Sequence, residues 1–154
     1  MSVTLDLSTL KTLRGKLEEL EQTKVRVGLF AETAGRSGVE KGRIDDNPSL
    51  GFVHEFGNAK KKIPERSFIR MPLMLHLAPL LEGKDWITSL MKRGVKRTLG
   101  FLGVLGEDCI QEAFATGGYG NWPALAPRTI ARKKSSRILI ESAQLRKAVA
   151  SKVV

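Results

Sequence analysis

The chain is poor in the residues on which most metal sites and disulfides depend. Its 154 residues include one cysteine and two histidines, and only 6% are aromatic. A single cysteine, Cys109, excludes an internal disulfide and a cysteine-based metal cluster. His54 and His76 lack ligand-like spacing, so the one metal site left open is a pair of histidines completed by a carboxylate.

Long apolar runs are also missing. The longest nearly uncharged stretch, residues 71–81, contains His76 and two prolines and is too short to cross a bilayer. The N-terminus has no basic segment followed by an apolar core, so we expect no secretory signal. These absences predict folding in a cytoplasm without a membrane partner.

Acidic residues are scarce relative to basic ones, with 16 Asp and Glu against 26 Lys and Arg and a net charge of +10. Residues 60–97 and 128–154 each carry +7, whereas residues 1–59 carry −1 and residues 98–127 carry −3. Such basic blocks suit nucleic acid or an acidic protein surface. They are equally compatible with solvated faces that keep a protein soluble, so charge alone leaves the partner open.

Hydrophobic periodicity predicts one α+β domain over residues 1–154, with a small antiparallel sheet packed by several α-helices. Alternation within residues 24–30 predicts a strand, and residues 148–154 suit a second strand that pairs with it. Apolar spacing of three and four predicts a helix that begins at Ser8 and runs through Leu20, and further helices over 47–56, 71–81, 84–98 and 99–114.

Glycine punctuates two of these regions in different ways. Residues 31–46 mix glycines with cations and show no periodicity, which predicts a long flexible loop that settles against a partner. Gly100, Gly103 and Gly106 recur within a predicted helix, where glycine is unfavourable. We therefore expect another backbone to approach the helix closely along that face.

We expect the segment 119–145 to fix the C-terminal part of the chain to the domain. Trp122 lies between Gly120 and Pro123, Pro127 presets the first turn of a short helix, and Ser142 is expected to cap a last helix that holds Leu145. Trp122 can be a buried peg whose N–H donates to a carbonyl, or an exposed interface residue. We prefer the buried peg.

Several motifs that begin like catalytic ones are incomplete. His54-Glu55 opens like the zinc-protease helix, but the second histidine is replaced by Asn58. Cys109 lies among apolar helical positions and is expected to be a packed thiol. The acidic residues Glu107, Asp108 and Glu112 are expected to form a solvated helix face. No catalytic group and no cofactor site follow from the sequence.

Three stretches, taken together, resemble a family of small virion proteins of tailed bacteriophages. They are Val-His-Glu-Phe-Gly at 53–57, Ile-Pro-Glu-Arg-Ser-Phe-Ile-Arg at 63–70, and Trp-Pro-Ala-Leu-Ala-Pro-Arg-Thr-Ile-Ala-Arg-Lys at 122–133 followed by Leu-Ile-Glu-Ser-Ala-Gln-Leu at 139–145. The family comprises neck, tail-completion and minor tail proteins involved in head–tail joining. The residues of this chain that carry the resemblance are His54, Phe56, Gly57, Phe68, Trp122, Pro127, Thr129 and Leu145.

The chain departs from the family pattern at three positions. Ser67 stands where proline is usual, Ala126 where a capping serine is usual, and Ala143 where glycine is usual. Because alanine tolerates a positive φ poorly, we expect the turn before Leu145 to be more regularly helical here.

The resemblance implies a structural virion protein without enzymatic activity or cofactor. It would assemble as a ring, expected to be hexameric, around the DNA channel of the neck or upper tail. Its partners would be further copies of itself, connector, tail terminator or tail tube proteins, and non-specifically the DNA in the channel. Both Arg66 and Arg70 are expected to project outward. The full set of candidate contact residues is Lys60, Lys61, Lys62, Arg66, Arg70, Lys92, Arg93, Lys96, Arg97, Arg128, Arg132, Lys133 and Lys134.

A second hypothesis uses the same cations differently. A small double-strand nucleic-acid-binding protein would contact the phosphate backbone through the two basic blocks and would bind free DNA in a strongly salt-dependent manner.

Overall fold

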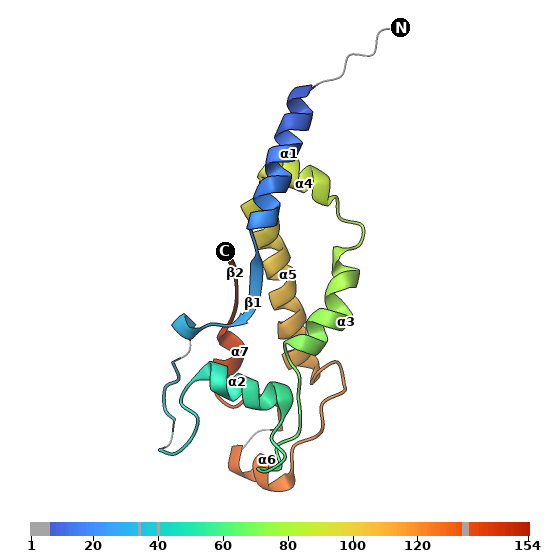
Figure 1. Cartoon of the computed structure of the whole chain (residues 1–154). Helices are drawn as coiled ribbons and strands as arrows, with labels where there is room; N and C mark the ends of the chain where they lie inside the picture. Colours follow the sequence, from blue (N-terminus) through green and yellow to red (C-terminus); the bar gives the residue numbers. More distant parts are fainter. Residues whose placement is uncertain (1–6, 34, 40, 134–135) are drawn as a thin grey trace.

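The fold is described here from a computed structural model, for residues 7–33, 35–39, 41–133 and 136–154. Over these residues the chain forms seven α-helices, a 3-10 helix and a two-stranded antiparallel sheet, which confirms the α+β class (Figure 1). In chain order the elements are α1 (Leu7–Gln22), β1 (Val25–Leu29), η1 (Ala31–Thr33), α2 (Asn47–Phe56), α3 (Arg70–Leu81), α4 (Trp86–Arg93), α5 (Val95–Thr116), α6 (Pro127–Lys133), α7 (Gln144–Lys147) and β2 (Val149–Val153).

Helix α5 is the centre of the fold, and the sheet and α3 pack against it. Two of its glycines admit the sheet. A Cβ on Gly103 would lie 2.6 Å from the Ser151 Oγ, and one on Gly106 would lie 3.0 Å from a Val27 methyl carbon. A close approach is therefore present at these two positions, but the nearest atoms belong to side chains and not, as predicted, to another backbone. At Gly100 the prediction is wrong, because a Cβ there would meet nothing within 4 Å.

The sheet joins two distant parts of the chain. Strand β1 pairs with β2 in antiparallel register from Val25 opposite Val153 to Leu29 opposite Val149, which confirms the expected pairing of these two segments. The main core lies between the sheet, α5 and the segment before α3. It is built around Phe68, Ile110 and Phe114, which are joined there by Leu145 and Val149.

The boundary between α4 and α5 differs from the prediction of one helix over 84–98. Gly94 has φ of 82° and ends α4, and α5 begins at Val95. The aspartate before α4, Asp85, caps it by accepting a hydrogen bond from the backbone N–H of Thr88 at 2.8 Å. The expected basic face of one continuous helix is thus divided between two helices that meet at a corner.

The turn before Leu145 also differs from the prediction. Ala143 adopts the left-handed conformation with φ of 58° and is the N-cap of α7, so the turn is not more regularly helical and Ser142 is not the cap. Leu145 is almost completely buried two residues later. Burial of this side chain in the core is the energetic reason that an alanine can be held at a positive φ.

Helix α1 forms where the leucine spacing predicted it, but none of its residues is buried. Figure 1 shows it extending from one end of the molecule, beyond the sheet. Its apolar stripe remains largely in solvent, because Leu7, Leu10 and Leu17 are all about half exposed or more. Within the described residues, no helix is long and apolar enough to cross a membrane.

Described residues of 31–46 contact the rest of the domain at several points, including the ion pair of Glu32 with Lys152 at 2.8 Å and the hydrogen bond from Arg36 to Asn47 at 3.1 Å. The Ser37 backbone N–H donates to the Gln144 Oε1 at 2.8 Å, and the Gln144 Nε2 donates back to the Ser37 carbonyl at 2.9 Å. Flexibility of the rest of this loop stays a prediction.

Candidate functional site

The three stretches that carry the resemblance meet in space, and Glu55 joins the first two. Its carboxylate accepts hydrogen bonds from the Ser67 hydroxyl at 2.5 Å and from the backbone N–H groups of Phe68, Ile69 and Arg70 at 2.8, 3.0 and 3.0 Å. These N–H groups lie at the start of α3, where a helix leaves its donors unsatisfied and favours negative charge. Glu55 is therefore the cap of α3, supplied by the last turn of α2.

Sequence reasoning missed this role. Glu55 is buried, although a glutamate beside an apolar stripe is normally solvated. The local sequence at the start of α3 gave no signal for it, because Ser67 is a capping residue whose Oγ accepts the Met71 N–H at 3.0 Å. We refer to Glu55, Arg66, Ser67 and Trp122, with the backbone atoms that they contact, as the motif junction.

Arg66 lies inside the motif junction, which corrects the expectation that it projects outward. Only 5% of the residue is exposed. Its Nε and Nη2 donate to the Pro123 carbonyl at 3.1 and 2.9 Å, and Nη2 also donates to the Ala124 carbonyl at 3.2 Å. Burial lowers the pKa of this guanidinium. Arg66 thus fixes the Trp122 segment to the domain. Arg70, by contrast, is exposed as predicted.

Trp122 completes the junction in the manner expected of a peg. Its indole N–H donates to the Ser67 carbonyl at 3.1 Å, and its ring meets Phe114 edge-on with centroids 6.0 Å apart. The side chain is half-buried, so it serves the core while one edge reaches the surface.

His54 lies on the other side of the junction. Its backbone carbonyl accepts the Arg66 N–H at 2.8 Å. Burial lowers the pKa of the imidazole to about 4, and the charges of Arg66, Lys133 and Arg36 act in the same direction. The His54 Nδ1 is buried without a hydrogen-bond partner in the described structure. At neutral pH the ring is uncharged.

The other histidine and the cysteine have packing environments of their own. His76 stacks on Tyr119 with ring centroids 3.5 Å apart, far along the chain from His54. Cys109 is buried in the core as predicted, and burial raises the pKa of its thiol. Among the described residues, no three His, Cys, Asp or Glu side chains gather in a way that could hold a metal ion.

The candidate cations do not form one surface. Lys92, Arg93, Lys96 and Arg97 are all exposed at the corner between α4 and α5. Lys60, Lys61 and Lys62 lie in the turn before α3, and Arg128 and Arg132 lie on α6, which Figure 1 shows at the opposite end of the molecule from α4. Lys134 falls outside the described residues.

Of the cations at the α6 end of the molecule, Lys61, Lys62 and Arg132 line a cationic groove of about 970 Å³. Its walls come from residues 36–39 and 42–44, α2, the 61–66 segment, α6 and the segment before α7. Apolar side chains, among them Leu50, Val53, Ile63 and Leu125, contribute to the lining, and Glu141 is an acidic residue among the described lining residues. The basic residues that line the groove are Arg36, Arg43, Lys61, Lys62, Arg66, Arg132 and Lys133. The candidates Lys60 and Arg128 do not line it.

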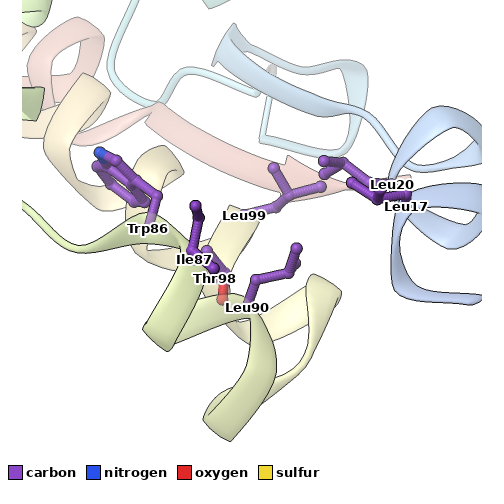
Figure 2. Close-up of a pocket in the computed structure, with 7 residues that line it drawn as sticks. All are labelled: Leu17, Leu20, Trp86, Ile87, Leu90, Thr98 and Leu99. Carbon is purple, nitrogen blue, oxygen red and sulfur yellow. The ribbon is translucent and has the colours of Figure 1, made fainter. Parts of the chain in front are cut away.

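A separate apolar cleft of about 300 Å³ lies where α1 meets α4 and α5. Figure 2 shows Leu17 and Leu20 on α1 at one side of the cleft and Trp86, Ile87 and Leu90 on α4 at the other. Ile87 is 71% exposed, so this helix contact buries only part of the available apolar surface. Further apolar side chains are open to solvent on α2 and α3, where Phe52 is 67% and Met74 is 70% exposed.

Comparison of the chain with protein-family models, with curated proteins and with solved structures gave no significant match.

Proposed function

We propose that the chain is a structural subunit of a homo-oligomeric ring in the neck or upper tail of a tailed bacteriophage virion. The observation that carries the proposal is the amount of apolar surface that this fold leaves uncovered. Phe52, Met74 and Ile87 are each about two-thirds exposed or more, and the leucine stripe of α1 has no buried member. Large exposed apolar patches in a folded protein mark surfaces that another protein covers.

The shape of the described part supports a subunit of an assembly. It is an elongated body from which α1 projects, and such a shape leaves two different ends available for contact (Figure 1).

The motif junction supports the same proposal from another direction. Residues of the three stretches that carry the resemblance hold a helix start, a buried guanidinium and an indole in place, so these stretches build a scaffold, as a structural component of a virion requires.

Closed rotational symmetry requires a heterologous interface, in which two different faces of the monomer meet. The exposed apolar residues satisfy this requirement because they occur on separate elements, on α1 and α4 at one end and on α2 and α3 elsewhere.

The test is the oligomeric state in solution, measured by sedimentation velocity and native mass spectrometry over micromolar to millimolar concentrations. We expect one closed oligomer, and we expect Phe52→Lys/Met74→Lys to weaken it. Glu82→Lys, which changes an exposed charged residue just after α3, is the matched control and should assemble normally. A wild-type chain that stays monomeric at the highest concentration, alone and with connector or tail tube proteins, would refute the proposal.

The nucleic-acid-binding hypothesis retains one specific observation in its favour. Four exposed cations, Lys92, Arg93, Lys96 and Arg97, lie within six residues at the α4–α5 corner. Duplex binding measured by fluorescence anisotropy between 50 and 200 mM salt separates the two functions. Tight binding of free duplex whose affinity falls ~10³-fold or more over this range, and is lost on reversal of the four charges, would favour the alternative.

A further inference from the structure

The side of α5 that faces away from the sheet carries charges of opposite sign at its two ends. Four exposed residues follow one another there at spacings of four, three and four, and therefore share one side of the helix: Arg97, Phe101, Val104 and Asp108. Gly103 and Gly106, which meet side chains of the strands, lie on the opposite side. We refer to the four exposed residues as the α5 ridge. In chain order it presents a cation, two apolar side chains and an anion.

The exposed side of α1 has a similar arrangement. Four exposed residues follow one another at the same spacings: Leu10, Arg14, Leu17 and Glu21. We refer to them as the α1 ridge. Within Leu7–Gln22 every basic residue precedes Leu17 and every acidic residue follows it, so this helix is also positive toward its N-terminus and negative toward its C-terminus. Leu10 is 49% and Leu17 47% exposed, although an amphipathic helix normally buries its apolar stripe.

The two ridges are complementary when the helices run antiparallel. Arg97 and Asp108 are eleven residues apart, which is about 16 Å along α5. Glu21 and Lys11, which flanks the α1 ridge, are ten residues apart, or about 15 Å along α1. An antiparallel alignment therefore places Glu21 beside Arg97 and Lys11 beside Asp108 at the same time. A parallel alignment would oppose like charges at both ends.

The charges that this alignment brings together are available in the subunit. Among the described residues, these four form no side-chain hydrogen bond or ion pair within the chain. Arg14 pairs with Glu18 at 2.9 Å, but the two side chains are 82% and 63% exposed. Exposed ion pairs of this kind contribute little to stability, so Arg14 can turn toward a neighbouring acidic residue at small cost.

We infer that α1 of one subunit packs antiparallel on the α5 ridge of a neighbouring copy of this chain. The inference rests on the proposed ring function and specifies one helix–helix contact within its heterologous interface. The two ridges lie on different elements, as closed rotational symmetry requires. Helix α1 extends beyond the sheet at one end of the molecule, which allows it to reach a neighbour (Figure 1).

Each part of the two ridges has a role in this contact. Leu10 and Leu17 of α1 cover Phe101 and Val104 of the neighbouring α5, so apolar surface that is exposed in the single subunit becomes buried. The oppositely charged pairs at the two ends fix the register and the direction of the helices, because any other alignment brings like charges together.

The test is the exchange of one charge pair, measured by sedimentation equilibrium. Glu21→Lys and Arg97→Glu should each weaken association by at least ~10-fold, because each change places like charges side by side. The chain that carries both changes should regain an affinity within a few-fold of wild type. The matched control is Glu19→Lys/Lys96→Glu, which reverses exposed charges of the same two helices away from the ridges and should change the affinity little. Circular dichroism establishes that every variant is folded.

The outcomes separate this inference from the proposed function. An oligomer that tolerates both single reversals refutes the inference and leaves the ring intact. Weakening by both reversals without recovery in the combined variant also refutes it, because the two residues then do not face each other. A wild-type chain that stays monomeric at millimolar concentration, alone and with connector or tail tube proteins, refutes the ring and the inference together.

Cross-linking tests the direction of the helices. Two single-cysteine-substituted variants are mixed at low concentration, concentrated together and treated with a short bismaleimide; Cys109 is buried and stays unreactive. Glu21→Cys should be joined to Arg97→Cys, and Lys11→Cys to Asp108→Cys, whereas none of the four variants should be joined to itself. Cross-links of Glu21→Cys to Asp108→Cys in place of these would mean parallel packing and would refute the inference.

Discussion

Among single replacements of charged residues by alanine, Glu55→Ala should lower the unfolding free energy the most. The change removes the acceptor of four hydrogen bonds, from the Ser67 hydroxyl and from the backbone N–H groups of Phe68, Ile69 and Arg70. Each buried donor left unsatisfied costs ~1–3 kcal/mol. Water can reach the exposed side near Arg70 and recover part of this loss, so we expect a decrease in unfolding free energy of about 3–5 kcal/mol.

Glutamine at the same position should cost less, about 2 kcal/mol, since its carbonyl can still accept two of the four hydrogen bonds while its NH₂ faces the remaining donors. For a chain of this size, each kcal/mol lowers the melting temperature by roughly 2–4 °C. Urea and thermal unfolding followed by circular dichroism therefore resolve both variants from wild type.

Glu65→Ala is the matched control for Glu55. Glu65 also pairs with Arg70, at 2.7 Å, but both side chains are about half exposed. Exposed ion pairs contribute ~0–1 kcal/mol, so this variant should be nearly as stable as wild type. The capping role assigned to Glu55 is wrong if Glu55→Ala and Glu65→Ala lower the unfolding free energy equally.

Three further predictions concern pH and backbone geometry. Because the pKa of His54 is about 4 in the folded chain and has its ordinary value of 6.5 in the unfolded chain, the unfolded chain binds the extra proton, and stability should fall by about 2 kcal/mol between pH 7.5 and 5. Urea unfolding at several pH values should show this loss in wild type and in the control His76→Asn, and a much smaller loss in His54→Asn; equal slopes in all three chains would contradict the assignment. Gly103→Ala should lower the unfolding free energy by about 1–3 kcal/mol, because its Cβ would approach a β2 side chain to 2.6 Å. Gly100→Ala should raise it by ~0.5–1 kcal/mol, because alanine has the higher helix propensity. Thermal melts that rank the two variants the other way would mean that the sheet does not pack as described. Ala143→Gly should raise the unfolding free energy by about 1 kcal/mol, since its φ of 58° strains alanine, and a loss of stability would show that this strain is absent.

The regular elements could be predicted from the sequence because their signals are local. Alternation predicted a strand within residues 24–30 and apolar spacing a helix over 47–56, and the structure has them at Val25–Leu29 and Asn47–Phe56. The glycine pattern of α5 also predicted a close approach, which occurs at Gly103 and Gly106 through side chains of the strands, because a missing side chain on the helix gives them room.

The failures share a different cause, which is dependence on partners far along the chain. Arg66 was expected to be exposed because arginine usually is, and only the carbonyls at Pro123 and Ala124, 57 and 58 residues later, make its burial favourable. The cap formed by Glu55 likewise spans two elements. Ala143 was expected to avoid a positive φ on local grounds, and the burial of Leu145 overrides that preference.

The lining of the cationic groove could not be predicted for the same reason, because it depends on segments far apart in the chain. A count of charges identifies the basic blocks, but it does not tell which cations share a groove and which point elsewhere. Lys60 and Lys61 are adjacent in sequence, and only Lys61 lines the groove. Such assignments depend on the relative placement of five segments, which no periodicity encodes.

The pairing of β1 with β2 has a consequence for how the protein is made. The paired residues Val25 and Val153 are separated by 128 positions, so β1 has no strand partner until β2 has left the ribosome. Contacts of such long sequence separation form late, because loop closure must precede them. A nascent or prematurely ended chain therefore exposes an unpaired strand edge, which is prone to aggregation. A chain that stops before β2 therefore cannot form the sheet that packs against α5.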